Sequence, residues 1–506
     1  MREIGIRSIH GVPGDFNLTA LDHVVNCGLK WVGNCNELNA GKVQLPKRAP
    51  TLRMLTNDHL GYAADGYARV NGISALMTIM GVGELSALNA IAGSFAEFVP
   101  VVHIINMPSR RAQNEGSCIH HTFGDGDFGI FKEMSARVSC MAVTLDCPED
   151  APSLVDAAIR ECWIQSRPTS IFIPSDLINV PIKADWENRS ALFEPPTSDL
   201  QAEEGLVTTI VDELTAATRP IFLIGGHGIR NKSMELVLDL IDTIQIPTLS
   251  SASGRGLINE DHVHYAGLYV GSCSNPGVIN LVASADLVIS FGSVQSDLGT
   301  AGFTGKVGRD ILIDIQRNCT TIRNQRPVRQ FIDGLLRALQ EGLLGSSILP
   351  CLWKPSNIMS QMPIDRSPDF MNGLMRRYTC VPANRGLKRL RHSLMRPFQR
   401  KCQIRHEILW PTLSSWLQCG DVILAEAGTS SFGIWQTVFA RDTTFIGQYL
   451  WASIGYTVGA CQGAALAVRD SKMSARRTIL FIGDGSFQIA CQELSSIIRL
   501  RLTPIM

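Results

Sequence analysis

The chain has 506 residues, which is too long for one compact core and predicts about three domains. Hydrophobic residues make up 45% and charged residues 18%, a composition that excludes a fibre or a disordered chain. Lys+Arg and Asp+Glu are equal at 46 each, so the net charge gives no reason to expect nucleic acid or a membrane as partner. The 14 cysteines include no C-x-x-C pair and the first residues lack the apolar core of a signal peptide, so we expect a cytoplasmic protein with reduced thiols.

Short apolar runs alternate with helix-like stretches in the first third of the chain. Residues 74–80 and 100–107 are predicted to be buried strands, residues 84–98 the helix between them, and residues 169–177 the last strand. Strand–helix–strand order is typical of a parallel sheet with helices on both faces. The sequence therefore predicts an α/β domain with a doubly wound parallel sheet over residues 1–185.

A second α/β domain is predicted over residues 200–345, after a polar linker. Its strands are expected within residues 220–230, within residues 285–293 and near residues 310–316. The Gly-Gly-His-Gly turn after the first of these strands allows two interpretations, a nucleotide-binding turn or a tight connection between strand and helix. Because its spacing is not G-x-G-x-x-G, we favour the tight connection.

The regular pattern is lost over residues 346–406, before a third domain that we place at residues 407–506. Ten Lys/Arg and no Asp/Glu lie between Arg376 and Arg405, which would suit either a nucleic-acid patch or a solvated connector. The basic residues lack regular aromatic interleaving, so we expect an irregular basic connector. In the third domain, strand-then-turn patterns return, and the chain ends soon after the second of them.

The strongest chemical signal is an apolar strand that runs into Gly483-Asp484-Gly485 and then into a helix. Glycines at such a turn let the backbone approach a diphosphate, and the following helix N-terminus favours its negative charge. The carboxylate of Asp484 can hold a divalent cation that bridges the diphosphate. The tripeptide alone is common, and we interpret its second copy, at residues 124–126, as a turn because no strand precedes it.

Five further segments accompany this motif: GVPGDFN (11–17), NCNELNA (34–40), CIHHTFGDGDF (118–128), AEAGTSSFGIW (425–435) and GQYLWASIGYTVGACQGAALA (447–467). With them, the chain resembles the thiamine-diphosphate-dependent 2-oxo-acid decarboxylases of the fungal pyruvate decarboxylase type. The resemblance implies three doubly wound α/β domains. In chain order these are a pyrimidine-binding domain, a central domain and a diphosphate-binding domain. It also implies thiamine diphosphate and Mg²⁺ as cofactors.

The resemblance assigns proton transfer to four residues. Glu37 matches the glutamate that activates the cofactor through its aminopyrimidine, a role that suits a carboxyl group whose pKa is raised by burial. Asp15, His120 and His121 match the groups that protonate the product carbon and deprotonate its hydroxyl group, which calls for side chains that titrate near neutrality. Without the resemblance, a glutamate at a helix start and two adjacent histidines are more often ordinary surface residues.

Contacts with the cofactor are implied near the end of the chain. Ile454 would be the apolar residue beneath the bent cofactor, although considered alone it would be an ordinary core residue. Asp484 would hold Mg²⁺, and Ala452 stands where the family usually has glycine. The cofactor-binding residues implied in addition to Glu37 are Thr429, Ala452, Ile454, Asp484, Gly485 and Ser486.

The activity that the resemblance implies is the non-oxidative decarboxylation of a small 2-oxo acid, with pyruvate giving acetaldehyde and CO₂. Two alternatives stay open, a preference for indolepyruvate or phenylpyruvate, and an inactive homologue that only associates with intact subunits. Because the family takes its glutamate from one subunit and its G-D-G turn from another, a homodimer or homotetramer with the site between subunits is expected.

Two segments depart from the family pattern. Residues 41–60 separate two segments that the family joins directly, and we interpret them as a retained insertion, with a genuine surface loop as the alternative. After Gly485 no Asn follows, whereas the family's motif supplies a second Mg²⁺ ligand there. We therefore expect the diphosphate-binding domain to be truncated and incomplete.

Overall fold

The computed structural model describes most of the chain and leaves five segments outside its description. Glu37, all but the last two residues of the predicted insertion and nearly all of the predicted basic connector fall in these segments. Among the described residues, no helix is long and apolar enough to cross a membrane. The described residues are 1–34, 59–182, 199–229, 232–344, 404–471 and 475–506.

The first sheet is entirely parallel and has the strand order β2-β1-β3-β4-β6-β5. Strands β3 and β4 confirm the predictions for residues 74–80 and 100–107, and their residues are all buried, as expected for strands covered on both faces. The strands are β1 (Ser8–Gly11), β2 (Lys30–Trp31), β3 (Ser74–Ile79), β4 (Val101–Met107), β5 (Met141–Thr144) and β6 (Thr169–Pro174). The helices are α1 (Leu18–Asn26), α2 (His59–Asn71), α3 (Val82–Ala96), α4 (Arg110–Asn114), α5 (Ile130–Ala136) and α6 (Ala151–Gln165).

The central sheet has the order β13-β12-β11-β10-β7-β8-β9. A parallel sheet was predicted, and the structure differs from this at one edge. Strands β12 and β13 run antiparallel at one edge, because a short turn at residues 316–319 folds β12 directly back on β11. The strands are β7 (Pro220–Ile224), β8 (Thr248–Ser251), β9 (Tyr265–Tyr269), β10 (Leu287–Phe291), β11 (Leu312–Ile315), β12 (Cys319–Ile322) and β13 (Val328–Arg329). The helices are α7 (Leu200–Ala216), α8 (Lys232–Ile244), α9 (Pro276–Ser284) and α10 (Ile332–Leu344).

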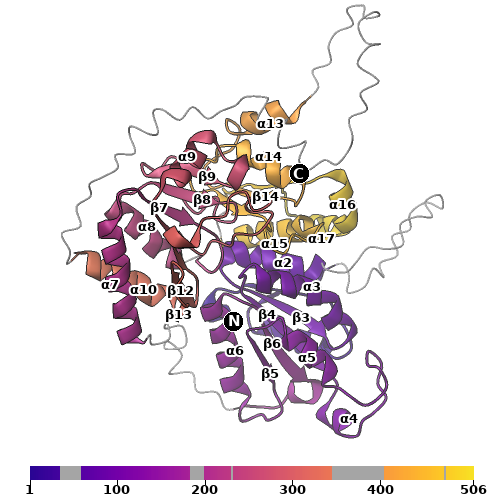
Figure 1. Cartoon of the computed structure of the whole chain (residues 1–506). Helices are drawn as coiled ribbons and strands as arrows, with labels where there is room; N and C mark the ends of the chain where they lie inside the picture. The colour runs from indigo at the N-terminus through magenta and orange to yellow at the C-terminus, as the bar shows by residue number, and fades with distance from the viewer. Residues whose placement is uncertain (35–58, 183–198, 230–231, 345–403, 472–474) are drawn as a thin grey trace, which may run out of the picture.

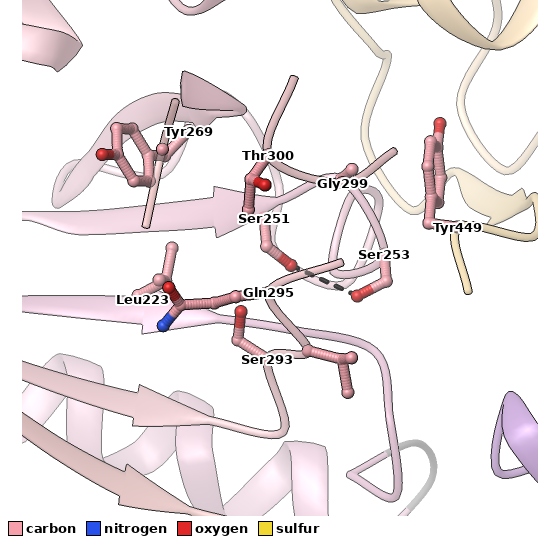
Figure 2. A pocket seen from close by; sticks show the side chains of 12 residues that line it. Leu223, Ser251, Ser253, Tyr269, Ser293, Gln295, Gly299, Thr300 and Tyr449 are labelled. Atoms are coloured by element: carbon pink, nitrogen blue, oxygen red, sulfur yellow. Dashed lines mark hydrogen bonds between the residues drawn. The ribbon is translucent and has the colours of Figure 1, made fainter. Parts of the chain in front are cut away.

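The Gly-Gly-His-Gly turn after β7 lies where the strand order of the central sheet reverses, the usual ligand crevice of such sheets. Here the crevice is closed, since a Cβ on Gly225 would come within 2.2 Å of the carbonyl oxygen of Gly292. Figure 2 shows the small space that is left, where the hydroxyl groups of Ser251 and Ser253 form a hydrogen bond of 3.2 Å. Its volume of about 10 Å³ is room for a single water molecule and not for a nucleotide. The interpretation as a tight connection therefore fits the structure.

The third sheet is parallel, with the order β15-β14-β16, and an isolated parallel bridge joins Ile479 to Ile505 beside it. The two predicted strand-then-turn patterns are confirmed as β14 followed by α14 and β16 followed by α16. The strands are β14 (Val422–Ala425), β15 (Thr444–Ile446) and β16 (Thr478–Phe481). The helices are α13 (His406–Leu413), α14 (Thr429–Gly433), α15 (Tyr456–Asp470), α16 (Asp484–Ala490) and α17 (Glu493–Arg499).

Helices α2 and α15 join the first and third sheets, and Figure 1 shows them lying side by side. Glycines let their backbones touch, because a Cβ on Gly463 would lie 1.8 Å from the carbonyl oxygen of Ala63. In the same way, a Cβ on Gly66 would lie 2.1 Å from the carbonyl oxygen of Ala460. The spacing of these two domains is therefore set by small residues at one helix crossing.

A buried ionic network lies beside this crossing. The carboxylate of Asp65 accepts hydrogen bonds from Arg69 Nε at 2.6 Å and from the Tyr456 hydroxyl at 2.5 Å. Glu97, at the end of α3, lies 3.8 Å from the Arg69 guanidinium and 3.3 Å from Nε2 of His227 in the central domain. Burial pushes the pKa of Glu97 up, but His227 and Arg69 outweigh it and lower the pKa to about 2. A charged carboxylate thus joins all three domains.

Replacing Gly463 with alanine tests the close helix crossing. The added methyl group must push the backbones of α2 and α15 apart, so we expect Gly463→Ala to lower the free energy of unfolding by about 1–3 kcal/mol in urea denaturation. Gly205, exposed in α7 with open space around it, is the matched control. There, alanine should stabilise the helix by about 0.5–1 kcal/mol. Equal midpoints for both variants would contradict the close contact.

Candidate active site

The structure brings together three of the residues predicted to transfer protons. Nε2 of His120 lies 2.7 Å from Oδ2 of Asp15, and both side chains are about half exposed. The rings of His120 and His121 meet edge to face with their centroids 4.6 Å apart, and Phe16 stacks on His120 at 5.1 Å. A carboxylate and two imidazoles therefore form one contiguous, solvent-accessible group, whose role in proton transfer stays a prediction.

Asp15 is held in place by the turn that follows β1. The side chain of Asn17 is buried and accepts a hydrogen bond from the Gly14 N–H at 2.9 Å. It also donates to the carbonyl oxygen of Val12 at 3.0 Å, which closes the turn around Asp15. Turns of this kind are usual for Asn, whose short side chain can bond to nearby backbone groups. The carboxylate is thereby fixed at the carboxyl end of a sheet strand.

His121 differs from its neighbour in its surroundings. Its backbone has a φ of 67°, in the left-handed region that a residue with a side chain rarely adopts. Burial lowers the pKa of His121, and the nearby His120 lowers it further, while Asp15 acts in the opposite direction. The lowered pKa favours a neutral imidazole that can accept a proton at neutral pH.

A second group of predicted residues lies at the carboxyl ends of β14 and β16. These strands are hydrogen-bonded neighbours, so the turns that begin at residues 426 and 482 leave the same edge of the sheet. Thr429 starts α14 on the first turn, and Asp484 starts α16 on the second. The predicted cofactor residues Thr429, Ile454, Asp484 and Gly485 are exposed, and Ala452 and Ser486 are partly exposed.

The backbone around these residues leaves room for a diphosphate. A Cβ on Gly428, Gly483 or Gly485 would meet no atom within 4 Å. Open backbone at the start of a helix beside an exposed carboxylate suits a diphosphate with a divalent cation. Among the described residues, no cluster of three or more His, Cys, Asp or Glu side chains could hold a metal ion. Asp484, the one residue that the sequence predicted as a metal ligand, lies at this edge with an exposed side chain, and its role stays a prediction.

Glu426 was not among the predicted site residues. It directly follows the buried strand β14, and its carboxylate accepts hydrogen bonds from the backbone N–H groups of Gly455 at 2.9 Å and Thr457 at 3.1 Å, and from the Thr457 hydroxyl. Burial raises the pKa of Glu426, and these hydrogen bonds oppose the shift. The carboxylate thus fixes the start of α15, and with it Ile454, against β14. An acidic residue immediately after four buried strand residues was the signal that could have identified it.

The segment before α15 is also held by the first domain. Glu97 accepts hydrogen bonds from three successive backbone N–H groups, of which Leu450 at 2.9 Å and Trp451 at 3.1 Å precede Ala452. The indole of Trp451 donates to Asn89 at 3.1 Å. Ala452 has a φ of 53°, which costs alanine about 1–2 kcal/mol and glycine nothing. This explains physically why glycine suits the position better.

Within one chain, the histidine pair belongs to the first domain, and the turns that carry Thr429 and Asp484 belong to the third. The histidine pair is in the loop between α4 and α5, which Figure 1 places at the outer end of the first domain. Helices α14 and α16, which carry Thr429 and Asp484, lie on the other side of α2 and α15 in this view. Glu37 lies outside the described residues, so its position is not part of this geometry.

Family comparisons agree with this arrangement of three sheets. The thiamine pyrophosphate enzyme N-terminal TPP binding domain matches residues 48–128, the central domain matches residues 207–340, and the C-terminal TPP binding domain matches residues 426–506. Each match falls inside one of the predicted domains, whose boundaries stay a prediction. The three matches, together with the three α/β sheets, identify the chain as a thiamine pyrophosphate enzyme.

Comparison with individual relatives identifies a family within this class of enzymes. A pyruvate decarboxylase of Aspergillus fumigatus is 41% identical over 505 residues, which cover 100% of this chain and 79% of that protein. One of Aspergillus terreus is also 41% identical, with 99% and 79% covered, and pyruvate decarboxylase isozyme 3 of Saccharomyces cerevisiae is 35% identical, with 100% and 80% covered. The chain belongs to the fungal-type, thiamine-diphosphate-dependent pyruvate decarboxylase family.

Removing the carboxylate of Glu426 tests its structural role. In Glu426→Ala, two buried N–H groups lose their acceptor, so we expect the free energy of unfolding to fall by about 1–3 kcal/mol and the affinity for thiamine diphosphate to fall with it. Thr457→Val removes only the hydroxyl donor and should cost about 1 kcal/mol. Urea denaturation and calorimetric titration measure the two effects. Wild-type stability in Glu426→Ala would refute the assignment.

Proposed function

We propose that this protein decarboxylates pyruvate to acetaldehyde and CO₂ with thiamine diphosphate and Mg²⁺. The observation that supports this most directly is the contiguous group of Asp15, His120 and His121, since release of an aldehyde needs proton transfer after CO₂ has left. The three domain matches and the pyruvate decarboxylase relatives support the cofactor and the substrate class.

Residues at the carboxyl edge of the third sheet would hold the cofactor. Thiamine diphosphate, when bound, supplies a nucleophilic carbon and an electron sink for the bond that breaks. An oxygen of Asp484 would bind Mg²⁺, and Gly485 and Ser486 at the start of α16 would lie against the diphosphate. Thr429, Ala452 and Ile454 would line the ring-binding part, with Ile454 as the apolar support. Glu37 would hold the proton that activates the pyrimidine.

The proton steps fall to the histidine pair. His120, which pairs with Asp15, suits the role of proton donor to the carbon that carried the carboxylate. His121, whose pKa is lowered by burial, suits the acceptance of the hydroxyl proton that accompanies release of the aldehyde. Two adjacent imidazoles, one of them paired with a carboxylate, can thus serve as acid and base in one cycle.

The substrate is proposed to be a small 2-oxo acid, and Trp451 is the residue that supports this choice. Its indole is held by Asn89 beside Ala452, which would narrow the space next to the cofactor. Indolepyruvate and phenylpyruvate need a pocket for an aromatic ring and are the alternative substrates.

We further propose a homodimer or homotetramer in the cytoplasm. The loop that carries the histidine pair and the helices α14 and α16 lie on different sides of α2 and α15 (Figure 1), which supports a site completed by a second chain. No cysteine among the described residues forms a disulfide, which supports a reducing compartment.

Steady-state kinetics test the activity and the choice of substrate. We expect CO₂ release from pyruvate that requires thiamine diphosphate, a kcat/KM for pyruvate above that for phenylpyruvate, and loss of activity on chelation that Mg²⁺ restores. A preference for the aromatic acid would favour the alternative substrate, and an absence of CO₂ release with a folded, cofactor-loaded protein would refute the proposal.

Mixed oligomers test the shared site. His121→Ala and Asp484→Ala should each be inactive, because each damages a different half of every site. In mixed dimers one of the two sites contains neither substitution, so random reassembly of equal amounts should restore about a quarter of wild-type activity. The control is each variant taken alone through the same unfolding and refolding. No recovery in the mixture would place both halves within a single chain.

A further inference from the structure

A glycine turn lies directly behind the histidine pair. Gly81 connects β3 to α3 and has a φ of 72°, in the left-handed region. A Cβ built on Gly81 would lie 2.0 Å from the carbonyl oxygen of His121, so the two backbones are in contact. His121 also has a positive φ, of 67°. Such a conformation persists only where the surrounding structure holds it.

One buried carboxyl group reaches this turn from the first turn of α3. Glu84 is fully buried, and its Oε2 accepts a long hydrogen bond of 3.4 Å from the Gly81 N–H. Its other oxygen accepts a hydrogen bond of 2.5 Å from the hydroxyl group of Ser135, which is also fully buried. Glu84 has no contact with Asp15 or His120 and takes no part in the proton steps described above.

Ser135 completes a closed ring of contacts. It lies on α5, the helix that follows the loop carrying the histidine pair. The ring runs from His121 to Gly81 through the backbone contact, from Gly81 to Glu84 and from Glu84 to Ser135 through hydrogen bonds, and back along the chain to His121. The loop is therefore held at the histidines and again at α5, with one carboxyl group common to both attachments.

We propose that Gly81 and Glu84 are positioning residues. They fix the backbone position of His121, and with it the orientation of the His120–His121 pair. The proposal rests on the proposed function in one respect, namely that the pair transfers protons in the reaction. Gly81 supplies the close approach that a larger residue would prevent, and Glu84 ties the turn and α5 together. Gly81 meets His121 only through this close approach to its backbone, and Glu84 forms no hydrogen bond or ion pair with Asp15, His120 or His121.

The protonation state of Glu84 agrees with this role. Burial raises the pKa of Glu84 to about 7, while the hydrogen bonds from Ser135 and Gly81 act against the shift. A carboxyl group whose pKa is raised in this way is neutral for much of the time near pH 7, which lowers the cost of burying it without a charged partner. A residue that only caps α3 does not need to be buried. Glu84 is fully buried between the turn and α5, which fits a role in joining the two.

The titration of His121, followed by NMR on the full-length chain with labelled histidines, tests the proposal without any cofactor. In Gly81→Ala, the added methyl group should push His121 outward, so that its pKa rises from the lowered value toward the ordinary one. The matched control is Gly116→Ala, a glycine near the same loop with a φ of 61° and no atom within 4 Å of the added carbon. It should leave the titration unchanged. An unchanged His121 titration in Gly81→Ala would overturn the proposal.

A second pair of variants covers the case in which Gly81→Ala fails to fold. Glu84→Ala removes both hydrogen bonds and should shift the His121 titration and lower kcat about 100-fold at unchanged affinity for thiamine diphosphate. Glu84→Gln keeps an acceptor for the Gly81 N–H and should rescue both. Loss of stability in Glu84→Ala with a wild-type His121 titration would reduce Glu84 to a helix cap and refute the proposal. Because NMR needs no turnover, this failure is distinct from an inactive wild-type protein, which would refute the proposed function alone.

Discussion

The buried charges of Asp65, Arg69 and Glu97 fix how the first domain meets the third. These charges lie where the first domain meets the third, and removing one partner of such a buried group typically costs about 3–5 kcal/mol because it leaves a charge unpaired. Glu97 also binds the backbone of the segment that leads to Ala452 and Ile454. The same carboxylate therefore holds the domains together and places part of the cofactor-binding edge.

This rigid junction has a consequence for the chemistry. Helices α2 and α15 pack backbone to backbone, so the first and third sheets cannot turn toward each other within a chain. The α4–α5 loop, with the histidine pair, and helices α14 and α16 lie on different sides of this junction (Figure 1). This arrangement is the structural basis of the proposed assembly from at least two copies, in which each site would take one half from each chain.

Sequence alone indicated those parts of the site that are encoded locally. The strand before Gly483 and the adjacent pair His120–His121 could be recognised in the sequence, because each motif occupies a few consecutive residues. Glu426 was missed because its partners Gly455 and Thr457 are distant in the sequence, and such pairings appear only when the strands are placed side by side. The antiparallel β12 and β13 were missed because they are short strands at a sheet edge, where periodicity is weak. The role of Glu37 stays a prediction.

The most direct test is a structure of the assembly with thiamine diphosphate and Mg²⁺ bound. The account predicts that Asp484 of one chain holds the metal and that His120 and His121 facing the bound cofactor come from a second chain. It also predicts that the segment held by Glu97 keeps its present path. A cofactor enclosed by residues of one chain alone, with the histidine pair far from it in every subunit, would contradict the account.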